Sequence, residues 1–134
     1  MNRFIDNGDG TITDATTYLM WTKDANLAKI GMTWGSASKY TNSLTFGGFS
    51  DWRLPTIKEL LSLIDYSQYN PALQVGHPFI NVRSNYYWSS TSFAGNPNDA
   101  WVVIMWNGYV GNYNKSDSYY NYVWPVRSLL GDVK

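Results

Sequence analysis

Cysteine is absent from the sequence, and histidine occurs once, as His77. Without cysteine the chain can form neither a disulfide framework nor a thiolate zinc site, and it is equally compatible with the cytosol and the exterior. An excess of charge is absent too, because ten basic side chains balance ten acidic ones and no block of lysine or arginine is long enough to follow a phosphate backbone. We therefore expect no nucleic-acid partner.

Long apolar runs are also missing from the sequence. No segment approaches the roughly 18 apolar residues that a membrane span needs, and the opening MNRFIDNGDG has neither the basic nor the apolar region of a signal peptide. We expect no direct membrane insertion. Export would require a targeting segment outside this sequence or another route.

Aromatic residues, in contrast, are abundant and make up 17% of the 134 positions. The hydrophobic share of 44% is enough for one core, so we expect a single domain over residues 1–134. Asparagine and tyrosine gather between residues 85 and 122, where each occurs seven times. Tyrosine offers flat contact and both residue types offer hydrogen bonds, which makes residues 85–122 a candidate variable binding region.

The first half of the chain predicts a hairpin, a short strand and two helices. The turn sequence NGDG at residues 7–10 separates two β-prone pieces, and a strand is predicted at residues 19–21. The first helix is predicted within residues 33–44, with a threonine cap. The second is predicted because Thr56 and Glu59 form a capping box before an apolar stripe at helical spacing.

The second half of the chain predicts a long loop followed by short strands. Turn residues without any apolar periodicity indicate a loop from Tyr66 to Ser84. Asn107-Gly108 is typical of a tight hairpin turn. The strands are predicted at residues 87–92, 100–106, 109–113 and 120–126. This order of elements predicts an α+β fold with two helices and short antiparallel sheets.

Motifs for catalysis or metal binding are incomplete. Aligning Asp9-Gly10 with a calcium loop puts Ile5 at the first ligand position and Thr16 at the last, so we interpret the segment as a turn, with a nonstandard calcium site as the alternative. His77 lies in the predicted loop with no partner to orient it. The ten acidic residues form no preferred pair. We therefore expect no enzyme, no cofactor and no metal.

The stretch DWRLP at residues 51–55 leads into the second predicted helix. An indole, a guanidinium and a carboxylate in this position predict a buried polar brace formed by Asp51, Trp52 and Arg53. Contact of these side chains with a ligand is the alternative.

Several segments together resemble one known family. They are FIDNGDGTITDATTYLMWTKDAN, FGGFSDWRLPTIKELLSLIDYSQYNPA, YYWSST, the spaced pattern AW-V-M-NG-V within residues 100–110, and YVWPVRS. Together they are similar to the Lcl C-terminal domain family, named for the collagen-like adhesin of Legionella. The likeness runs from about Asn2 to Ser128, and Tyr18 departs from it where glycine is expected. The resemblance implies a C-type-lectin-like fold used for display and binding, without catalysis.

The YVWPVRS ending after an Asn/Tyr-rich tract also resembles family members that are variable proteins of diversity-generating retroelements. In such systems template adenines are copied with errors, so that codons of the AAC type become asparagine, tyrosine, serine, aspartate and others. Trp106 departs from this pattern, because tryptophan cannot arise from such a codon by changing adenines.

The predicted strand at residues 100–106 carries apolar residues on both faces. Side chains alternate along a strand, so Trp101, Val103 and Met105 share one face. The resemblance treats this set as constant, and we assign it inward and the opposite face outward; burial of both faces is the alternative. Exposed rings beside tyrosine and asparagine are the make-up of an antibody-like paratope. The candidate ligand contacts are Tyr86, Phe93, Asn96, Asn98, Val102, Ile104, Trp106, Asn107, Tyr109, Asn112, Tyr113, Asn114, Asp117, Tyr119, Tyr120 and Asn121.

We expect a diversified ligand-binding module, extracellular or at the cell surface, that holds a protein or cell-surface ligand. A glycan-binding adhesin is the alternative. Sulfated glycans are disfavoured, because Asp99, Lys115 and Asp117 give the candidate region a charge near −1 rather than a basic cluster. The collagen-like relative suggests trimers, but that assembly could depend on a collagen segment, which this sequence does not contain.

Overall fold

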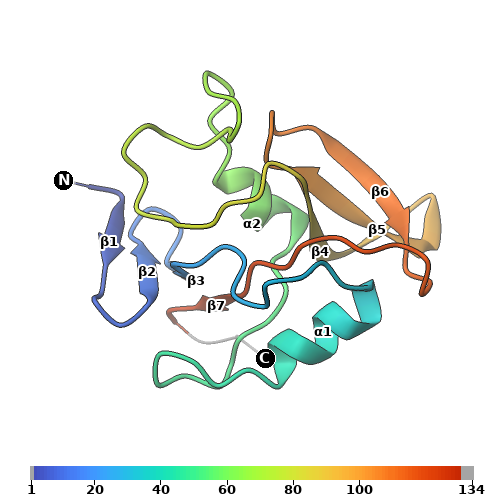
Figure 1. Cartoon of the computed structure of the whole chain (residues 1–134), viewed down its shortest axis with the longest axis horizontal. Helices are drawn as coiled ribbons and strands as arrows, with labels where there is room; N and C mark the ends of the chain where they lie inside the picture. The colour runs from blue at the N-terminus through green and yellow to red at the C-terminus, as the bar shows by residue number, and fades with distance from the viewer. Residues whose placement is uncertain (1, 131–134) are drawn as a thin grey trace.

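Two small antiparallel sheets and two helices make up the α+β fold of this protein (Figure 1). The structure, a computed structural model, describes residues 2–130. In chain order the elements are β1 (Phe4–Asp6), β2 (Thr11–Asp14), β3 (Leu19–Thr22), α1 (Trp34–Asn42), α2 (Ile57–Ser62), β4 (Tyr86–Phe93), β5 (Asn96–Ile104), β6 (Val110–Asn114) and β7 (Val126–Ser128).

The first sheet has the strand order β1-β2-β3-β7 and joins the two ends of the chain. Its opening hairpin confirms the predicted one, and the NGDG segment is a turn in which the Asp9 carboxylate accepts from the amide and the hydroxyl of Thr11. Tyr18 ends the next turn at φ +57°, in the left-handed region that favours glycine. The family resemblance had led us to expect glycine at this position.

Both helices begin at the caps that the sequence predicts. The Thr33 hydroxyl accepts from the amide of Ser36 at the start of α1. At the start of α2, Thr56 accepts from the amide of Glu59, and the Glu59 carboxylate accepts from the amide of Thr56, which completes the capping box.

The second sheet has the order β4-β5-β6, and its two hairpins confirm the predicted antiparallel region. The expected strand at residues 120–126 is wrong for most of its length. Asn121 and Tyr122 make isolated bridges to Met32 and Tyr87, and β7 begins only at Val126 and joins the first sheet. This segment crosses from one sheet to the other, so its main chain bonds several different partners in turn.

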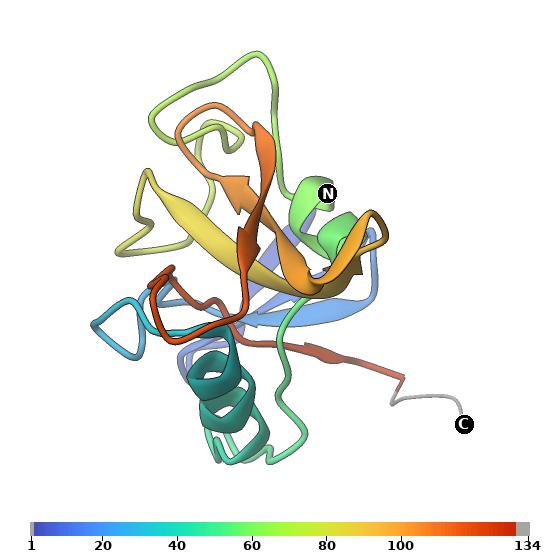
Figure 2. The same cartoon turned by 90° about the vertical axis from the view of Figure 1, so that its right-hand side faces the viewer.

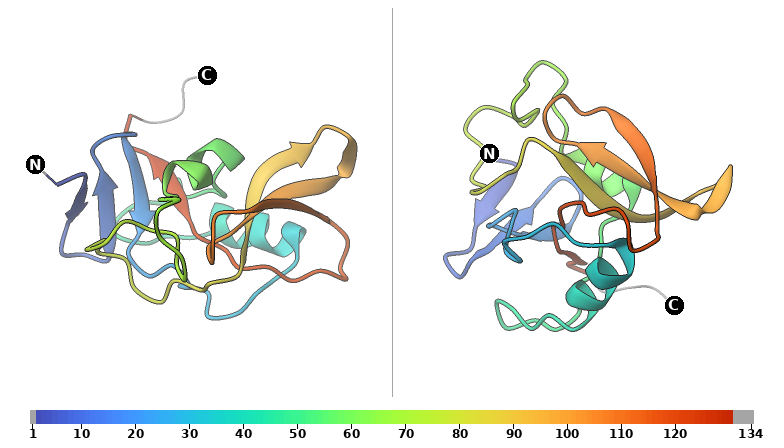
Figure 3. Two further views of the ribbon diagram at one scale, coloured as in Figure 1. Left: turned by 90° about the horizontal axis from the view of Figure 1, so that it is seen from above. Right: turned by 45° about the vertical axis from the view of Figure 1, so that its right-hand side comes forward.

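Two hydrophobic cores hold the sheets and helices together. Seen from above, the sheets lie at opposite ends of the molecule with the helices between them (Figure 3). The first core fills the space between the first sheet, α2 and strands β4 and β5, and includes Trp21 and Trp124. The second core lies under α1, on the other face of the β4-β5-β6 sheet (Figure 2), and consists of Ala37, Leu54, Trp88, Ala100, Val102 and Val123.

The DWRLP stretch forms two ion pairs in place of one brace. Asp51 pairs with Arg127 at 2.6 Å, and the Arg127 guanidinium lies 3.7 Å from the centre of the Phe49 ring. Arg53 instead forms two hydrogen bonds, of 2.7 and 2.9 Å, to the capping carboxylate of Glu59. Asp51 therefore holds β7 through Arg127, and Arg53 holds the first turn of α2 through Glu59.

Candidate functional site

Strand β5 is buried on both faces along its middle. Val103 packs in the first core, and Val102 packs in the second core with no exposed surface. The prediction that Val102 faces solvent is therefore wrong, because α1 and the segment before β7 cover that face. Trp101, predicted inward, is only half-buried, since it lies beyond the first core against the ring of Phe93, with centroids 4.7 Å apart. Burial from both sides explains why this strand is apolar on both faces.

Three tyrosine rings lie next to one another beside the second core, on the sheet face that α1 covers, and reach from there toward solvent. Tyr86 meets Tyr113 with ring centroids 5.2 Å apart, and Tyr113 meets Tyr119 at 5.5 Å. We call Tyr86, Tyr113 and Tyr119 the tyrosine array. A β-carbon at Gly111 would make ordinary van der Waals contacts with Val102 at 3.6 Å and with the Tyr86 ring at 3.9 Å, so this position does not require glycine. Burial, with Tyr86 nearby, raises the pKa of the Tyr113 phenol.

A second group of rings stands at the turn between β5 and β6. Trp106 is 45% exposed, and its ring meets that of Tyr69 edge to face at 6.2 Å. Tyr109 leaves the same turn and is 71% exposed, while Tyr69 is 74% exposed. We call Tyr69, Trp106 and Tyr109 the turn cluster. The sequence predicts that Tyr69 lies in a loop, but nothing in the sequence indicates that its ring contacts Trp106.

The turn cluster rests on a fixed backbone. The amides of Asn70 and Ala72 donate to the carbonyls of Trp106 and Met105 at 2.7 and 2.8 Å, so the loop is bonded to the turn. Gly108 lies at φ +84°, and a β-carbon there would come within 2.6 Å of the Ile64 side chain. The predicted hairpin is present, but its connection is longer than expected, because β5 ends at Ile104 and β6 begins at Val110. The backbone at Gly108 explains why this connection needs glycine.

The side chains of several candidate asparagines form hydrogen bonds within the protein. Asn112 and Asn114 both donate from their amide groups to the carboxylate of Asp99, at 2.8 and 3.3 Å. Asn96 and Asn107 accept from main-chain amides two residues further along the chain, as is usual for asparagine in turns. These bonds hold the turns in one shape before any ligand arrives.

Asn121 is the second candidate that the structure removes from the surface. It is 7% exposed, and its main-chain amide and carbonyl both bond Met32, because the chain is crossing between the sheets at this point. Its side-chain amide nitrogen is buried without a hydrogen-bond partner. The expectation that Asn121 contacts a ligand from the surface therefore does not fit its place in the fold.

The remaining candidates do not form one patch. Phe93, Asn96 and Asn98 lie at the β4–β5 hairpin, and Trp106 lies past the opposite end of β5. Eight steps along a strand separate Asn96 from Ile104, a distance of about 26 Å. The exposed candidates are Asn96, Asn98, Trp106, Tyr109, Asn112, Asp117, Tyr119 and Tyr120, and the half-buried ones are Tyr86, Phe93, Ile104, Asn107, Tyr113 and Asn114.

The charged side chains near these surfaces are mostly engaged. The Lys115 ammonium donates to Ser92 and to the carbonyl of Pro97, and it lies 4.5 Å from the centre of the Trp34 ring. Away from this region, the only histidine accepts a main-chain hydrogen bond from Phe79, and burial lowers the pKa of His77. Within residues 2–130, no three His, Cys, Asp or Glu side chains gather closely enough to hold a metal ion.

Comparison with known proteins identifies the family. Residues 10–127 match the family model described as the Lcl C-terminal domain. The chain belongs to this family. No curated protein matches it. Membership in the Lcl C-terminal domain family indicates an adhesin-like module that binds some ligand at a surface or outside the cell. Among the helices of residues 2–130, neither has the length and apolar character needed to cross a membrane.

The motifs that carry the Lcl resemblance form the scaffold. Trp88 of YYWSST and Trp124 of YVWPVRS are completely buried. Arg127 of the same ending fastens Asp51 of DWRLP. The tyrosine array and the turn cluster lie mostly outside these motifs. In this chain the shared motifs therefore build most of the fold, and positions outside them supply Trp106, Tyr109, Tyr113 and Tyr119, whereas Tyr69 and Tyr86 belong to the motifs themselves.

Proposed function

We propose that this Lcl C-terminal domain is a non-enzymatic display module that binds a protein or cell-surface ligand on the turn cluster and the neighbouring tyrosine array. The observation that carries this proposal is the exposure of Trp106 and Tyr109 on a turn whose backbone is hydrogen-bonded to a second loop. Exposed apolar patches that gather several rings commonly mark interaction sites.

The make-up of the surface supports a protein ligand. Tyrosine and tryptophan contribute large contact areas with few rotatable bonds, and a few central rings supply most of the binding energy of such interfaces. The asparagines around them are held by Asp99 and by main-chain amides, so little order has to be created on binding. The proposed contacts accordingly exclude the buried Val102 and Asn121.

The finer proposal is that the exposed positions are varied by a diversity-generating retroelement, on a C-type-lectin-like scaffold. It is supported by Tyr109, Asn112 and Tyr120, which are exposed and of residue types that adenine-directed copying produces. A genome search tests it: the proposal expects a near-copy of the 3′ end of the gene beside a reverse transcriptase, differing at template adenines. If no such copy is found, diversification is ruled out and ligand binding remains.

A display experiment tests the binding module itself. In one phage library, Tyr109, Asn112, Tyr113, Tyr119 and Tyr120 are randomised, and binders are selected against hen lysozyme as an arbitrary protein. We expect most members to remain folded, judged by protease resistance, and lysozyme binders to be enriched. A matched library at five buried positions is the control and should be largely unfolded. Similar protease sensitivity in both libraries would contradict the proposal.

A neutral glycan is the second candidate ligand, favoured by the exposed Trp106 ring against which a sugar can stack. Sulfated glycans fit less well, because the ammonium of Lys115 already bonds Ser92 and Pro97. A glycan array with wild type and Trp106→Ala distinguishes the candidates. A signal for neutral sugars that the substitution abolishes would favour the adhesin, and an array without signal would favour the protein ligand.

A further inference from the structure

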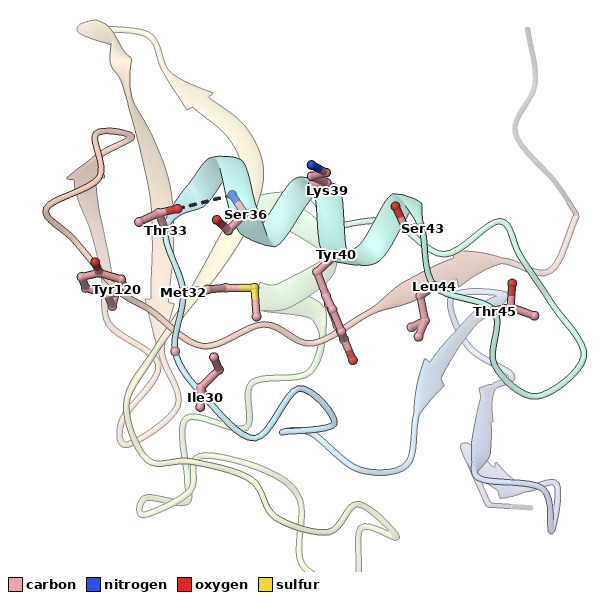
Figure 4. Close-up of a pocket in the computed structure, with 11 residues that line it drawn as sticks. Ile30, Met32, Thr33, Ser36, Lys39, Tyr40, Ser43, Leu44, Thr45 and Tyr120 are labelled. Atoms are coloured by element: carbon pink, nitrogen blue, oxygen red, sulfur yellow. Dashed lines mark hydrogen bonds between the residues drawn. The ribbon is translucent and has the colours of Figure 1, made fainter.

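A groove runs along helix α1, apart from the proposed ligand surface (Figure 4). Its volume is about 680 Å³, and one wall is the helix, whereas Ile30 and Met32 of the preceding segment form the other. Tyr120 closes one end and Leu44 lies at the other. The volume is within the range of about 300–1,000 Å³ that is usual for small-molecule sites.

The floor of this groove is largely apolar. The Met32 thioether and the side chain of Leu44 face the open space, and Ile30 is 62% exposed beside them. The helix residues along the wall follow helical spacing, so the groove is elongated and continues for about 16 Å from Thr33 to Leu44. An elongated apolar groove fits an extended hydrocarbon chain.

An extended peptide would find few hydrogen-bond partners in the same place. The main-chain amide and carbonyl of Met32 are both bonded to Asn121, so this wall offers no free strand edge there. The helix on the opposite wall bonds its own main chain. A peptide laid in the groove would gain no strand-edge hydrogen bonds from Met32 or α1, whereas a hydrocarbon chain needs none.

Charge at the groove is positive on one rim. Lys39 is the only charged side chain of the lining, and no carboxylate among residues 2–130 forms an ion pair with it. The sequence has no acidic residue between positions 25 and 50. Tyr40, the next residue of the same helix, extends from the lower side of α1 while Lys39 lies at its upper edge (Figure 4), and burial, together with Asp24, raises the pKa of Tyr40. An anion is therefore favoured at the Lys39 rim and disfavoured on the Tyr40 side.

We propose that this groove binds a single-chain amphiphile of the fatty-acid class, with its hydrocarbon chain over Met32 and Leu44 and its carboxylate at the ammonium group of Lys39. The groove uses neither the turn cluster nor the tyrosine array, and of the positions proposed to vary for display it contains only Tyr120.

The probe is sodium decanoate, kept below its critical micelle concentration and titrated into ¹⁵N-labelled protein while two-dimensional amide NMR spectra are recorded. We expect progressive shifts at residues 30–45 and Tyr120, with a dissociation constant of about 1 mM for a ligand of this size. Decyltrimethylammonium, which has the same chain length and the opposite charge, should bind more weakly than decanoate.

Charge reversal gives the decisive comparison. Lys39→Glu should weaken decanoate binding about tenfold and strengthen that of decyltrimethylammonium. Lys58→Glu makes the same change at an exposed position of α2 and should alter neither. Leu44→Ser should weaken both ligands, because it removes apolar contact and leaves the charge unchanged. The dispersion of the amide spectrum checks that each variant is folded.

Three outcomes would overturn the proposal. They are the absence of shifts with decanoate, shifts centred on the turn cluster in place of α1, and equal loss of decanoate affinity in the Lys39 and Lys58 variants. Trp106→Ala should leave decanoate binding unchanged, which separates a failure of this proposal from a failure of the display function.

Discussion

In the first core, Trp21 and Trp124 meet edge to face at 5.2 Å with no exposed surface, whereas Trp106 and Tyr69 meet edge to face at 6.2 Å in the open. The same ring geometry occurs in both places. What differs is the surroundings: the first pair lies between two sheets, and the second stands on a turn with solvent around it. The comparison teaches that the aromatic residues of this chain lie in two different environments: buried rings stabilise the fold, and exposed rings form the surface on which we propose that a ligand binds.

The largest expected effect is on the buried side of that comparison. Trp124→Ala removes a completely buried indole that also donates to the carbonyl of Thr22, and we expect it to lower the free energy of unfolding by about 3–5 kcal/mol. Trp106→Ala should cost less than about 1 kcal/mol, because much of its ring is already in water. Urea unfolding followed by circular dichroism measures both. Equal losses would mean that the turn cluster is part of the core.

A smaller effect is expected where the first sheet carries a buried charge. Burial alone would raise the pKa of Asp14, but hydrogen bonds from Arg3 and Thr17 outweigh burial and hold the pKa below its usual range. A carboxyl group with a depressed pKa in the folded state stabilises the protein above its unfolded pKa, near 4, and loses this contribution as the pH falls through the folded value.

The test compares wild type with Asp14→Asn from pH 7 to pH 2. At pH 7 the variant should be less stable by about 1–3 kcal/mol, because Arg3 loses its charged partner. The difference should shrink steadily below about pH 4, where the wild-type carboxylate takes up its proton. Thermal unfolding measures it. A constant difference over the whole range would show that this ion pair does not set the acid stability.

The smallest expected effect lies in the turn that presents the exposed rings. Gly108→Ala places a β-carbon in a left-handed backbone and against the Ile64 side chain, and should cost about 1–2 kcal/mol. Gly35→Ala is the matched control: a β-carbon there meets nothing within 4 Å, and in helix α1 it should stabilise by about 0.5 kcal/mol. A neutral Gly108 substitution would show that the turn can take another shape.

Much of the fold could be predicted from the sequence because its signals are local. The Thr56–Glu59 capping box and the NGDG turn depend on neighbours in the chain, and both elements appear as expected. Local signals could not predict which face of β5 is buried. Strand alternation separates Val102 from Val103 but does not tell that α1 covers the first and α2 the second, since that depends on contacts distant in sequence.

The candidate site was predicted in part for the same reason. Composition pointed to the segment that contains Trp106 and Tyr109, and both are exposed. Composition also included Asn121, which the crossing between the sheets buries. It left out Tyr69, because nothing in a loop sequence indicates that Asn70 will donate to the carbonyl of Trp106. The groove along α1 had no sequence signal, as its walls come from segments that are ordinary by themselves.

The double burial of strand β5 sets a rule for how this region can evolve or be engineered. Completely buried and half-buried residues are interleaved here: Val102 and Val103 are completely buried, whereas Trp101 and Ile104 on either side of them are only half-buried. Random substitution at every position of this strand would unfold most variants, because it would also change the buried residues. A library intended to test the proposed display function should therefore choose its codons position by position and leave the buried residues of β5 unchanged.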